Sequence, residues 1–272
     1  MNTVAGLGKK SRTKLGKLLR DTKGTISVEQ AAGSLSLSPK VAAKTLAGWA
    51  NQGWLSRVRR GLYVPVPLET RTGDIALDDP LIVAERLFAP CYVGGWSAAE
   101  HWGLTEQIFR SILVMTTRKP RDRKPAIKGT TFVIRTILPE SLFGTKTVWR
   151  GQVKVNVSDP SRTVLDLMDD PILGGGLRPS ADMLQSYLRR SESKDLKLLA
   201  SYAERLGSGA AFKRLGFLLE QFAPDERQAI EACRKRITKG NVKLDPSLPA
   251  DRLVTAWRLW VSESWAKERR ND

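Results

Sequence analysis

The sequence predicts an α+β protein of 272 residues with a winged helix-turn-helix at its N-terminus, a mixed α/β middle unit and an all-helical C-terminal region. Three patterns support this prediction. Capped helical repeats give way to a short hairpin near the N-terminus, strand-like and helical segments then alternate, and helical spacing of apolar residues resumes toward the C-terminus. The expected domains are 10–66, 79–176 and 177–272, with a polar linker over 67–78.

The first 52 residues carry the signals of three consecutive helices. Leucines at helical spacing predict a helix over 10–20, and Ser27 is expected to cap a second helix over 28–33. Ser38 and Pro39 predict the start of a third helix, because the serine side chain accepts a free backbone amide and proline fits the first helical position. The inner face of this third helix is expected to consist of Val41, Ala42, Leu46 and Trp49.

A basic hairpin follows the third helix. Trp54 and Leu55 are expected to begin a strand, residues 56–61 to form the turn, and residues 62–64 to return. Three arginines on so short a turn repel one another unless a polyanion lies close. A third helix that is apolar inside and polar outside, followed by this hairpin, predicts a winged helix-turn-helix, whose third helix enters the major groove of DNA. The residues expected to contact DNA are Ser38, Lys40, Lys44, Arg57, Arg59 and Arg60.

The charge of the chain also favours a polyanionic partner. Lys and Arg number 45 against 28 Asp and Glu, a net charge of +17, and residues 1–75 hold 13 basic residues against 4 acidic ones. A field of this sign attracts nucleic acid and raises encounter rates with it. The alternatives are a solvated basic face or a winged helix that binds only protein. The chain has no apolar run long enough for a membrane span and no apolar leader, so we expect a cytoplasmic protein without a membrane partner.

A second basic run lies in a loop of the middle unit, at Arg118, Lys119, Arg121, Arg123 and Lys124. Its role is open from the sequence. Three roles are compatible with it: the loop extends the DNA-binding surface, it binds RNA or an acidic partner, or it is a solvated surface without a partner.

Candidate catalytic groups are sparse. His101 is the only histidine and stands one helical turn after Ser97, but the neighbouring Glu100 does not share that face. One histidine and two separated cysteines, Cys91 and Cys233, give no metal-ligand spacing, and both thiols are expected to be buried and free. The sequence therefore predicts no enzyme, no cofactor and no metal.

Four carboxylates are of the kind that a metal-dependent nuclease uses: Asp159, Asp166, Asp169 and Asp170. A nuclease core needs an acidic residue and a lysine close together on strands, but the pairs Glu192–Lys194 and Asp195–Lys197 lie in helical sequence, so the match is poor. Asp159 before Pro160 is more simply a helix cap, with Arg162 as its expected ion-pair partner. Asp166 and Asp170 share one helix face and are expected at a solvated edge.

The C-terminal region is expected to begin after a turn at residues 174–176, three glycines that lack the Lys–Ser/Thr of a phosphate-binding loop. Its last helix is expected to carry an apolar stripe at three- and four-residue spacing, which serves as core or as a dimer face. The stripe comprises Leu253, Trp257, Trp260 and Val261.

Three motifs give the chain a family resemblance: Arg60–Tyr63, Trp96–Thr105 and Val157–Asp166. In this order they resemble the AbiEi-type antitoxins of bacterial abortive-infection, type IV toxin–antitoxin systems, over most of residues 10–180. The resemblance implies a transcriptional autorepressor that binds double-stranded operator repeats of its own operon. Because winged helices often bind inverted repeats, the chain is expected to bind DNA either as a dimer or as two cooperating monomers. It also implies an antitoxin that counters a nucleotidyltransferase-like toxin without a stable complex.

Two other functions fit the same residues. The first is a nucleic-acid-processing enzyme with a winged-helix targeting domain, which metal-dependent cleavage by the pure protein would favour. The second is a plain transcription factor whose C-terminal region senses a ligand or dimerises. A toxin-like gene beside its own gene would separate the antitoxin from that second alternative.

Overall fold

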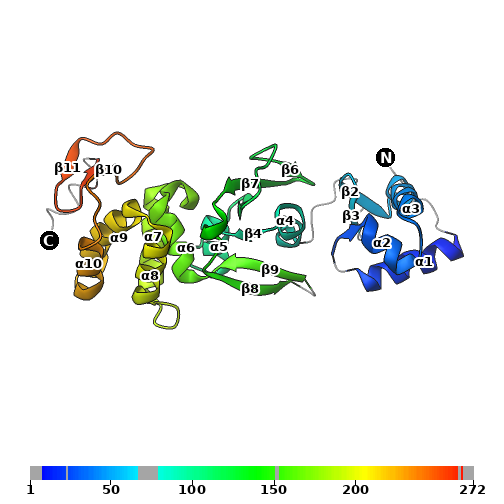
Figure 1. The fold of residues 1–272 in the computed structure, drawn as a ribbon, viewed down its shortest axis with the longest axis horizontal. Coiled ribbons are helices and arrows are strands. Elements are labelled where there is room, and N and C mark those ends of the chain that lie inside the picture. Colours follow the sequence, from blue (N-terminus) through cyan, green and yellow to red (C-terminus); the bar gives the residue numbers. More distant parts are fainter. Residues whose placement is uncertain (1–7, 23, 67–78, 151–152, 263–264, 266–272) are drawn as a thin grey trace.

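The structure is a computed structural model that describes residues 8–22, 24–66, 79–150, 153–262 and 265. The chain forms an elongated molecule with the N-terminal helices at one end, a six-stranded sheet in the middle and a helical part with a small sheet at the other end (Figure 1). The predicted α+β class is confirmed. The predicted linker over 67–78 lies outside the described residues. None of the helices in the described ranges has the length and hydropathy needed to cross a membrane.

The N-terminal unit packs three helices against a three-stranded sheet. Its helices are α1 Lys9–Asp21, α2 Val28–Leu35 and α3 Pro39–Asn51, and its strands, in the order β1-β3-β2, are β1 Ile26–Ser27, β2 Leu55–Arg59 and β3 Leu62–Pro65. Ser27 and Gln30 form a reciprocal capping box, and the side chain of Ser38 accepts a hydrogen bond from the backbone of Val41. Both predicted caps are therefore confirmed, and α2 runs two residues further than expected, to Leu35.

Two sequence expectations about this unit are wrong. The turn predicted over 56–61 is shorter, because β2 continues through Arg59 and the chain reverses at Arg60 and Gly61, where Gly61 takes a positive φ of 79°. Val41 is not on the inner face of α3, since 48% of its surface is exposed. The buried stripe of α3 is Ala42, Leu46 and Trp49, and Val41 stands one residue, or about 100°, off that stripe.

The middle unit is a mixed sheet in the order β6-β7-β5-β4-β9-β8 with helices at its edges and faces. Its elements are α4 Pro80–Phe88, β4 Cys91–Val93, α5 Gly95–His101, β5 Ser111–Thr116, β6 Ala126–Ile127, β7 Thr130–Thr136, β8 Thr145–Arg150, β9 Val153–Ser158 and α6 Pro160–Asp169. Strands and helices alternate along this unit, as the sequence predicts, and Asp159 caps α6 as expected. Strands β6 and β8, both at sheet edges, were not predicted.

The C-terminal part begins with four helices, α7 Leu177–Arg189, α8 Leu196–Leu206, α9 Gly209–Phe222 and α10 Arg227–Arg234. The prediction of helix to the end of the chain is wrong. A three-stranded sheet follows instead, made of β10 Val242–Lys243, β11 Arg252–Val254 and β12 Leu259–Val261. The expected helical stripe does not exist, because Leu253 and Trp260 face each other across two strands while Trp257 lies in the turn between them. One hydrophobic core runs from Tyr92 in the sheet to Trp265 near the C-terminus.

Helix α4 lies between the N-terminal unit and the sheet (Figure 1). Leu62 and Val64 of β3 share a hydrophobic cluster with Val83 and Leu87 of α4 and with Phe132 of β7. The hairpin of β2 and β3 is thus fixed on one face by apolar packing. Leu55 and Tyr63 pack in the core of the N-terminal helices, so the hairpin is held by apolar contacts on both faces.

Candidate nucleic-acid interface

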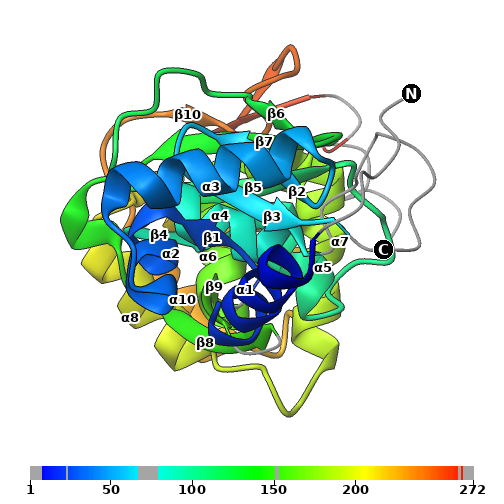
Figure 2. The same ribbon diagram turned by 90° about the vertical axis from the view of Figure 1, so that its right-hand side faces the viewer.

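The outer surface of α3 carries the first group of predicted DNA-contacting residues. Ser38, Lys40 and Lys44 are all exposed. The hydroxyl oxygen of Ser38 accepts the Val41 N–H at 3.4 Å, so this side chain also holds the start of the helix. Seen from the N-terminal end of the molecule, α3 runs across the front of the sheet and no other described segment passes over it (Figure 2).

The arginines of the hairpin are exposed, although apolar side chains on both of its faces are packed. Arg57 stands opposite Tyr63 and Arg59 opposite Leu62, with a register irregularity between the two arginines. Val58 lies between them and joins the cluster on α4. Arg57 lies on the face of the hairpin that carries Tyr63, Arg59 follows the irregularity beside Leu62, and Arg57, Arg59 and Arg60 are all exposed.

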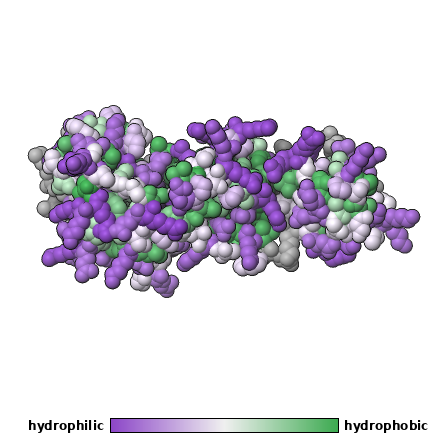
Figure 3. Space-filling model, in the orientation of Figure 1, coloured by the Kyte–Doolittle hydropathy of each residue, from purple (hydrophilic) through white to green (hydrophobic). Residues whose placement is uncertain are grey.

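The two groups lie on one side of the molecule. Helix α3 and strand β2 both occupy the upper side in Figures 1 and 2, and the β6–β7 hairpin follows them on that side over the middle unit. Hydrophilic side chains project along this upper edge (Figure 3). Helix α1, which carries the exposed cations Lys9, Lys10, Arg12, Lys14 and Lys17, lies on the lower side. The N-terminal charge is therefore divided between two sides.

The basic loop of the middle unit connects β5 to β6. Its five cations are exposed: Arg118, Lys119, Arg121, Arg123 and Lys124. The backbone N–H of Ile134 donates to the carbonyl of Arg123 at 2.8 Å, and the Asp122 carboxylate accepts the Lys124 N–H at 2.8 Å. The loop is thus tied to β7, and its charges are presented from a defined backbone.

Ser97 and His101, the residues considered for catalysis, do not contact each other but have other hydrogen-bond partners. The Ser97 hydroxyl accepts the backbone N–H of Leu113 at 2.9 Å, and His101 Nδ1 lies 3.2 Å from Nη2 of Arg150. Burial and the Arg150 charge lower the pKa of His101. The serine and the histidine therefore have separate partners, and each has a structural contact.

The carboxylates of α6 are structural as well. Asp159 caps the helix by accepting the Arg162 N–H at 2.8 Å, as expected, but the ion-pair partner of Arg162 is Asp166, not Asp159. The expectation of a solvated Asp166 is wrong, since only 3% of its side chain is exposed. Its position on the inner face of α6, against Tyr92, explains this burial. Within the described ranges, no group of three or more His, Cys, Asp or Glu side chains is arranged to hold a metal ion.

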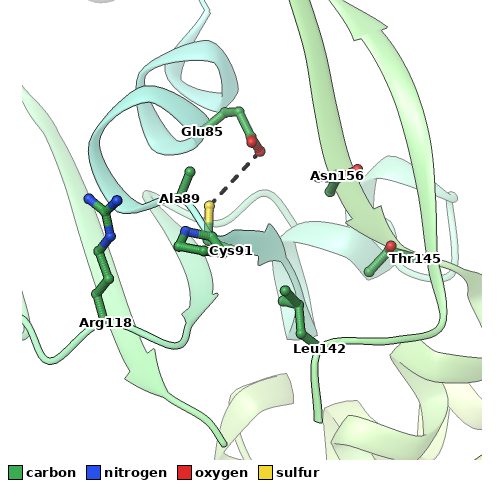
Figure 4. Close-up of a pocket in the computed structure, with 8 residues that line it drawn as sticks. Glu85, Ala89, Cys91, Arg118, Leu142, Thr145 and Asn156 are labelled. Carbon is green, nitrogen blue, oxygen red and sulfur yellow. Dashed lines mark hydrogen bonds between the residues drawn. The ribbon is translucent and has the colours of Figure 1, made fainter. Parts of the chain in front are cut away.

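A pocket of about 470 Å³, which was not predicted from the sequence, lies beside α4 (Figure 4). Glu85, Cys91 and Asn156 line it, and Arg118 of the basic loop stands at its side. The Cys91 thiol donates to the Glu85 carboxylate over 3.9 Å. Burial and this carboxylate raise the pKa of Cys91 to about 12, while burial raises that of Glu85. The thiol therefore stays protonated, which makes it a poor nucleophile. Both cysteines are buried and free, as predicted.

Comparisons with known proteins support the interpretation of the N-terminal unit. A crystal structure of the RV2827C protein from Mycobacterium tuberculosis is similar over 99% of this chain and 97% of that chain, with a TM-score of 0.65 and 17% sequence identity, so it shares the fold. No curated protein matches the sequence. A family model described as "Transcriptional regulator, AbiEi antitoxin" matches residues 14–66, which contain α2, α3 and both hairpin strands. Residues 14–66 are therefore similar to the domain that describes this family of transcriptional regulators.

Proposed function

We propose that this protein is a DNA-binding transcriptional autorepressor of its own operon and an antitoxin that counters a nucleotidyltransferase-like toxin in the cytoplasm. The observation that carries the proposal is the shared side of α3 and the hairpin. Helix α3 and strand β2, which both carry exposed cations, lie on the same side of the molecule, within a segment that matches a family of transcriptional regulators.

In the proposed complex with double-stranded DNA, α3 contacts the bases and the hairpin contacts the phosphates. The N-terminal turn of a recognition helix contacts base edges in the major groove, and Lys40 and Lys44 stand on the first two turns of α3. Arg57, Arg59 and Arg60 are placed to neutralise phosphates beside that groove, which supplies affinity without sequence preference. The packing of Leu62 and Val64 on α4 limits movement of the hairpin and so lowers the entropic cost of ordering its arginines on DNA.

The antitoxin part of the proposal rests on the description of the family that residues 14–66 match. The middle and C-terminal parts, which share one core, are the candidates for that activity because they lie outside the segment that the family model matches. Neutralisation is proposed to need no stable complex with the toxin. On operator repeats, two molecules of the chain are proposed to bind side by side or as a dimer.

The test of DNA binding compares two double variants that lose the same charge. Lys40→Ala with Lys44→Ala removes cations of α3, and Lys14→Ala with Lys17→Ala removes cations of α1 on the opposite side. In a gel shift with the DNA upstream of its own gene, the first variant is expected to lose at least ten-fold in affinity and the second less than three-fold. Equal losses, or no shifted band with the unaltered protein, would overturn the proposal.

Autorepression and neutralisation are tested in cells with the same variants. A reporter driven by the upstream DNA should be repressed by the unaltered protein and by the α1 variant, but not by the α3 variant. The proposal expects a nucleotidyltransferase-like toxin gene beside its own gene. In cells that express such a toxin, all three proteins should restore growth, because the α3 variant keeps the middle and C-terminal parts intact. If the unaltered protein does not restore growth, the antitoxin role is contradicted. The repressor role is then judged from the reporter assay alone.

A further inference from the structure

Two residues on the outer surface of α3 are not explained by packing within the described part of the chain. Val41 is an apolar side chain with 48% of its surface exposed. Gly48 lies inside the helix, and a Cβ placed on it would meet no atom within 4 Å. A glycine inside a helix is destabilising by about 0.5–1 kcal/mol relative to alanine, so neither packing nor helix propensity accounts for Gly48.

Val41, Lys44 and Gly48 lie on one face of α3. Their spacing of three and four residues places them on successive turns, next to the stripe of Lys40 and Asn51. Val41 belongs to the first turn of the helix, where its backbone N–H is capped by Ser38. This is the turn that enters deepest into a major groove. The branched side chain of Val41 has few rotamers, so its methyl groups are held in place before any contact forms.

We infer that this face of α3 recognises thymine: Val41 packs on the C5-methyl group of one thymine, and Gly48 lets the helix backbone come close to the DNA. Thymine is the base that presents a methyl group in the major groove, and apolar side chains select it there. The flat surface at Gly48 allows the approach that the short Val41 side chain needs to reach a base edge. The inference rests on the proposed DNA binding and adds the base that this helix prefers.

In the first step, the full chain selects a DNA duplex from a random pool. In the second step, each thymine of that duplex is replaced in turn by uracil, which removes one methyl group. At one thymine of each half-site, this replacement should weaken binding by the unaltered protein by about four-fold, as loss of one buried methyl contact predicts. Val41→Ala should bind the thymine and uracil duplexes equally. Leu19→Ala, which removes an exposed apolar side chain of α1, should keep the four-fold difference.

Glycine variants give a second, independent readout. Gly48→Ala should raise the thermal midpoint of unfolding but weaken binding to the selected duplex at least ten-fold. Gly33→Ala is the matched control, because Gly33 is also helical and open in α2, and this variant should raise the midpoint without loss of affinity. Equal thymine-to-uracil effects in the unaltered protein and Val41→Ala, or unchanged affinity of Gly48→Ala, would overturn the inference. A chain that selects no duplex contradicts the proposed DNA binding and this inference with it.

Discussion

Arg162 and Asp166 stand one turn apart on α6 and form an ion pair with 2.8 Å between Nε and Oδ1, although only 1% and 3% of their side chains are exposed. The hydroxyl of Tyr92 in β4 donates to the second oxygen of Asp166 at 3.0 Å and accepts from Nη2 of Arg162 at 3.0 Å. These contacts tie the sheet to the helix that begins the C-terminal core. The motif that carries part of the family resemblance is thus a structural link between the two parts of the molecule.

Arg162→Ala should lower the free energy of unfolding by about 3–5 kcal/mol, because it leaves Asp166 as a buried carboxylate without its cation. Urea unfolding followed by circular dichroism measures this change. Arg135→Ala is the control, since the Arg135–Asp170 pair is 3.7 Å apart with side chains 40% and 36% exposed, and its loss should cost less than about 1 kcal/mol. Similar costs for the two variants would contradict the structural role of the buried pair.

Gly216→Ala should destabilise the protein even though alanine is the better helix former. Gly216 lies inside α9, and a Cβ there would collide with the indole ring of Trp257, whose Nε1 donates to Glu220 at 2.7 Å. Because the ring is fully buried, the overlap must be relieved by moving packed atoms, at a cost of about 1–3 kcal/mol. A differential scanning calorimetry trace with an unchanged or higher midpoint would show that Trp257 is not packed there.

The elements that could be predicted from the sequence are those that depend on residues close together in the chain. Helix starts at Ser27, Ser38, Asp79 and Asp159 were predictable, because a cap depends on neighbours within three residues. The three-residue spacing of Trp257 and Trp260 imitates a helix, but their structure is decided by distant partners. Trp257 packs against Gly216, and β12 pairs with β10 and β11. Such contacts between segments far apart in the chain leave no local signal.

The candidate site was predictable in part for the same reason. The cations of α3 and the hairpin follow from local pattern, and the structure leaves all of them exposed. The exposure of Val41 could not be predicted, because apolar residues 41 and 42 compete for one inner face and only tertiary packing selects Ala42. Strand β8 was missed because Thr145–Arg150 is a mostly exposed edge strand with little apolar alternation.

His101 should make the stability of the protein depend on pH. Burial and the neighbouring Arg150 lower its pKa in the folded state below the ordinary value of 6.5, so protonation costs more in the folded chain than in the unfolded one. The stability that the neutral ring contributes is present above about pH 6.5 and is lost as the pH falls below it. The difference in unfolding free energy between the unaltered protein and His101→Gln should therefore shrink from pH 7.5 to pH 5.5. A constant difference would contradict the contact with Arg150.

Arg121→Ala with Arg123→Ala tests whether the basic loop extends the DNA-binding surface. Because the loop follows the hairpin along one side of the molecule, its cations should reach only DNA that continues past the hairpin (Figure 1). The double variant should lose about three- to ten-fold in affinity for a long duplex and nothing for a duplex limited to the half-site. Fluorescence anisotropy with the long and the short duplex measures the two affinities. If the double variant binds both duplexes as tightly as the unaltered protein does, the loop does not contact DNA.

The salt dependence of DNA binding tests the central claim most directly, because each neutralised phosphate adds about 0.9 to the slope of log K against log salt concentration. Replacement of Arg57, Arg59 and Arg60 together by alanine should reduce that slope by about 2–3 and weaken binding to specific and unrelated duplexes alike. Lys14→Ala with Lys17→Ala, on the far side of the unit, should leave the slope within about 0.5 of the unaltered protein. An unchanged slope in the arginine variant would contradict the assignment of the hairpin to the phosphate backbone.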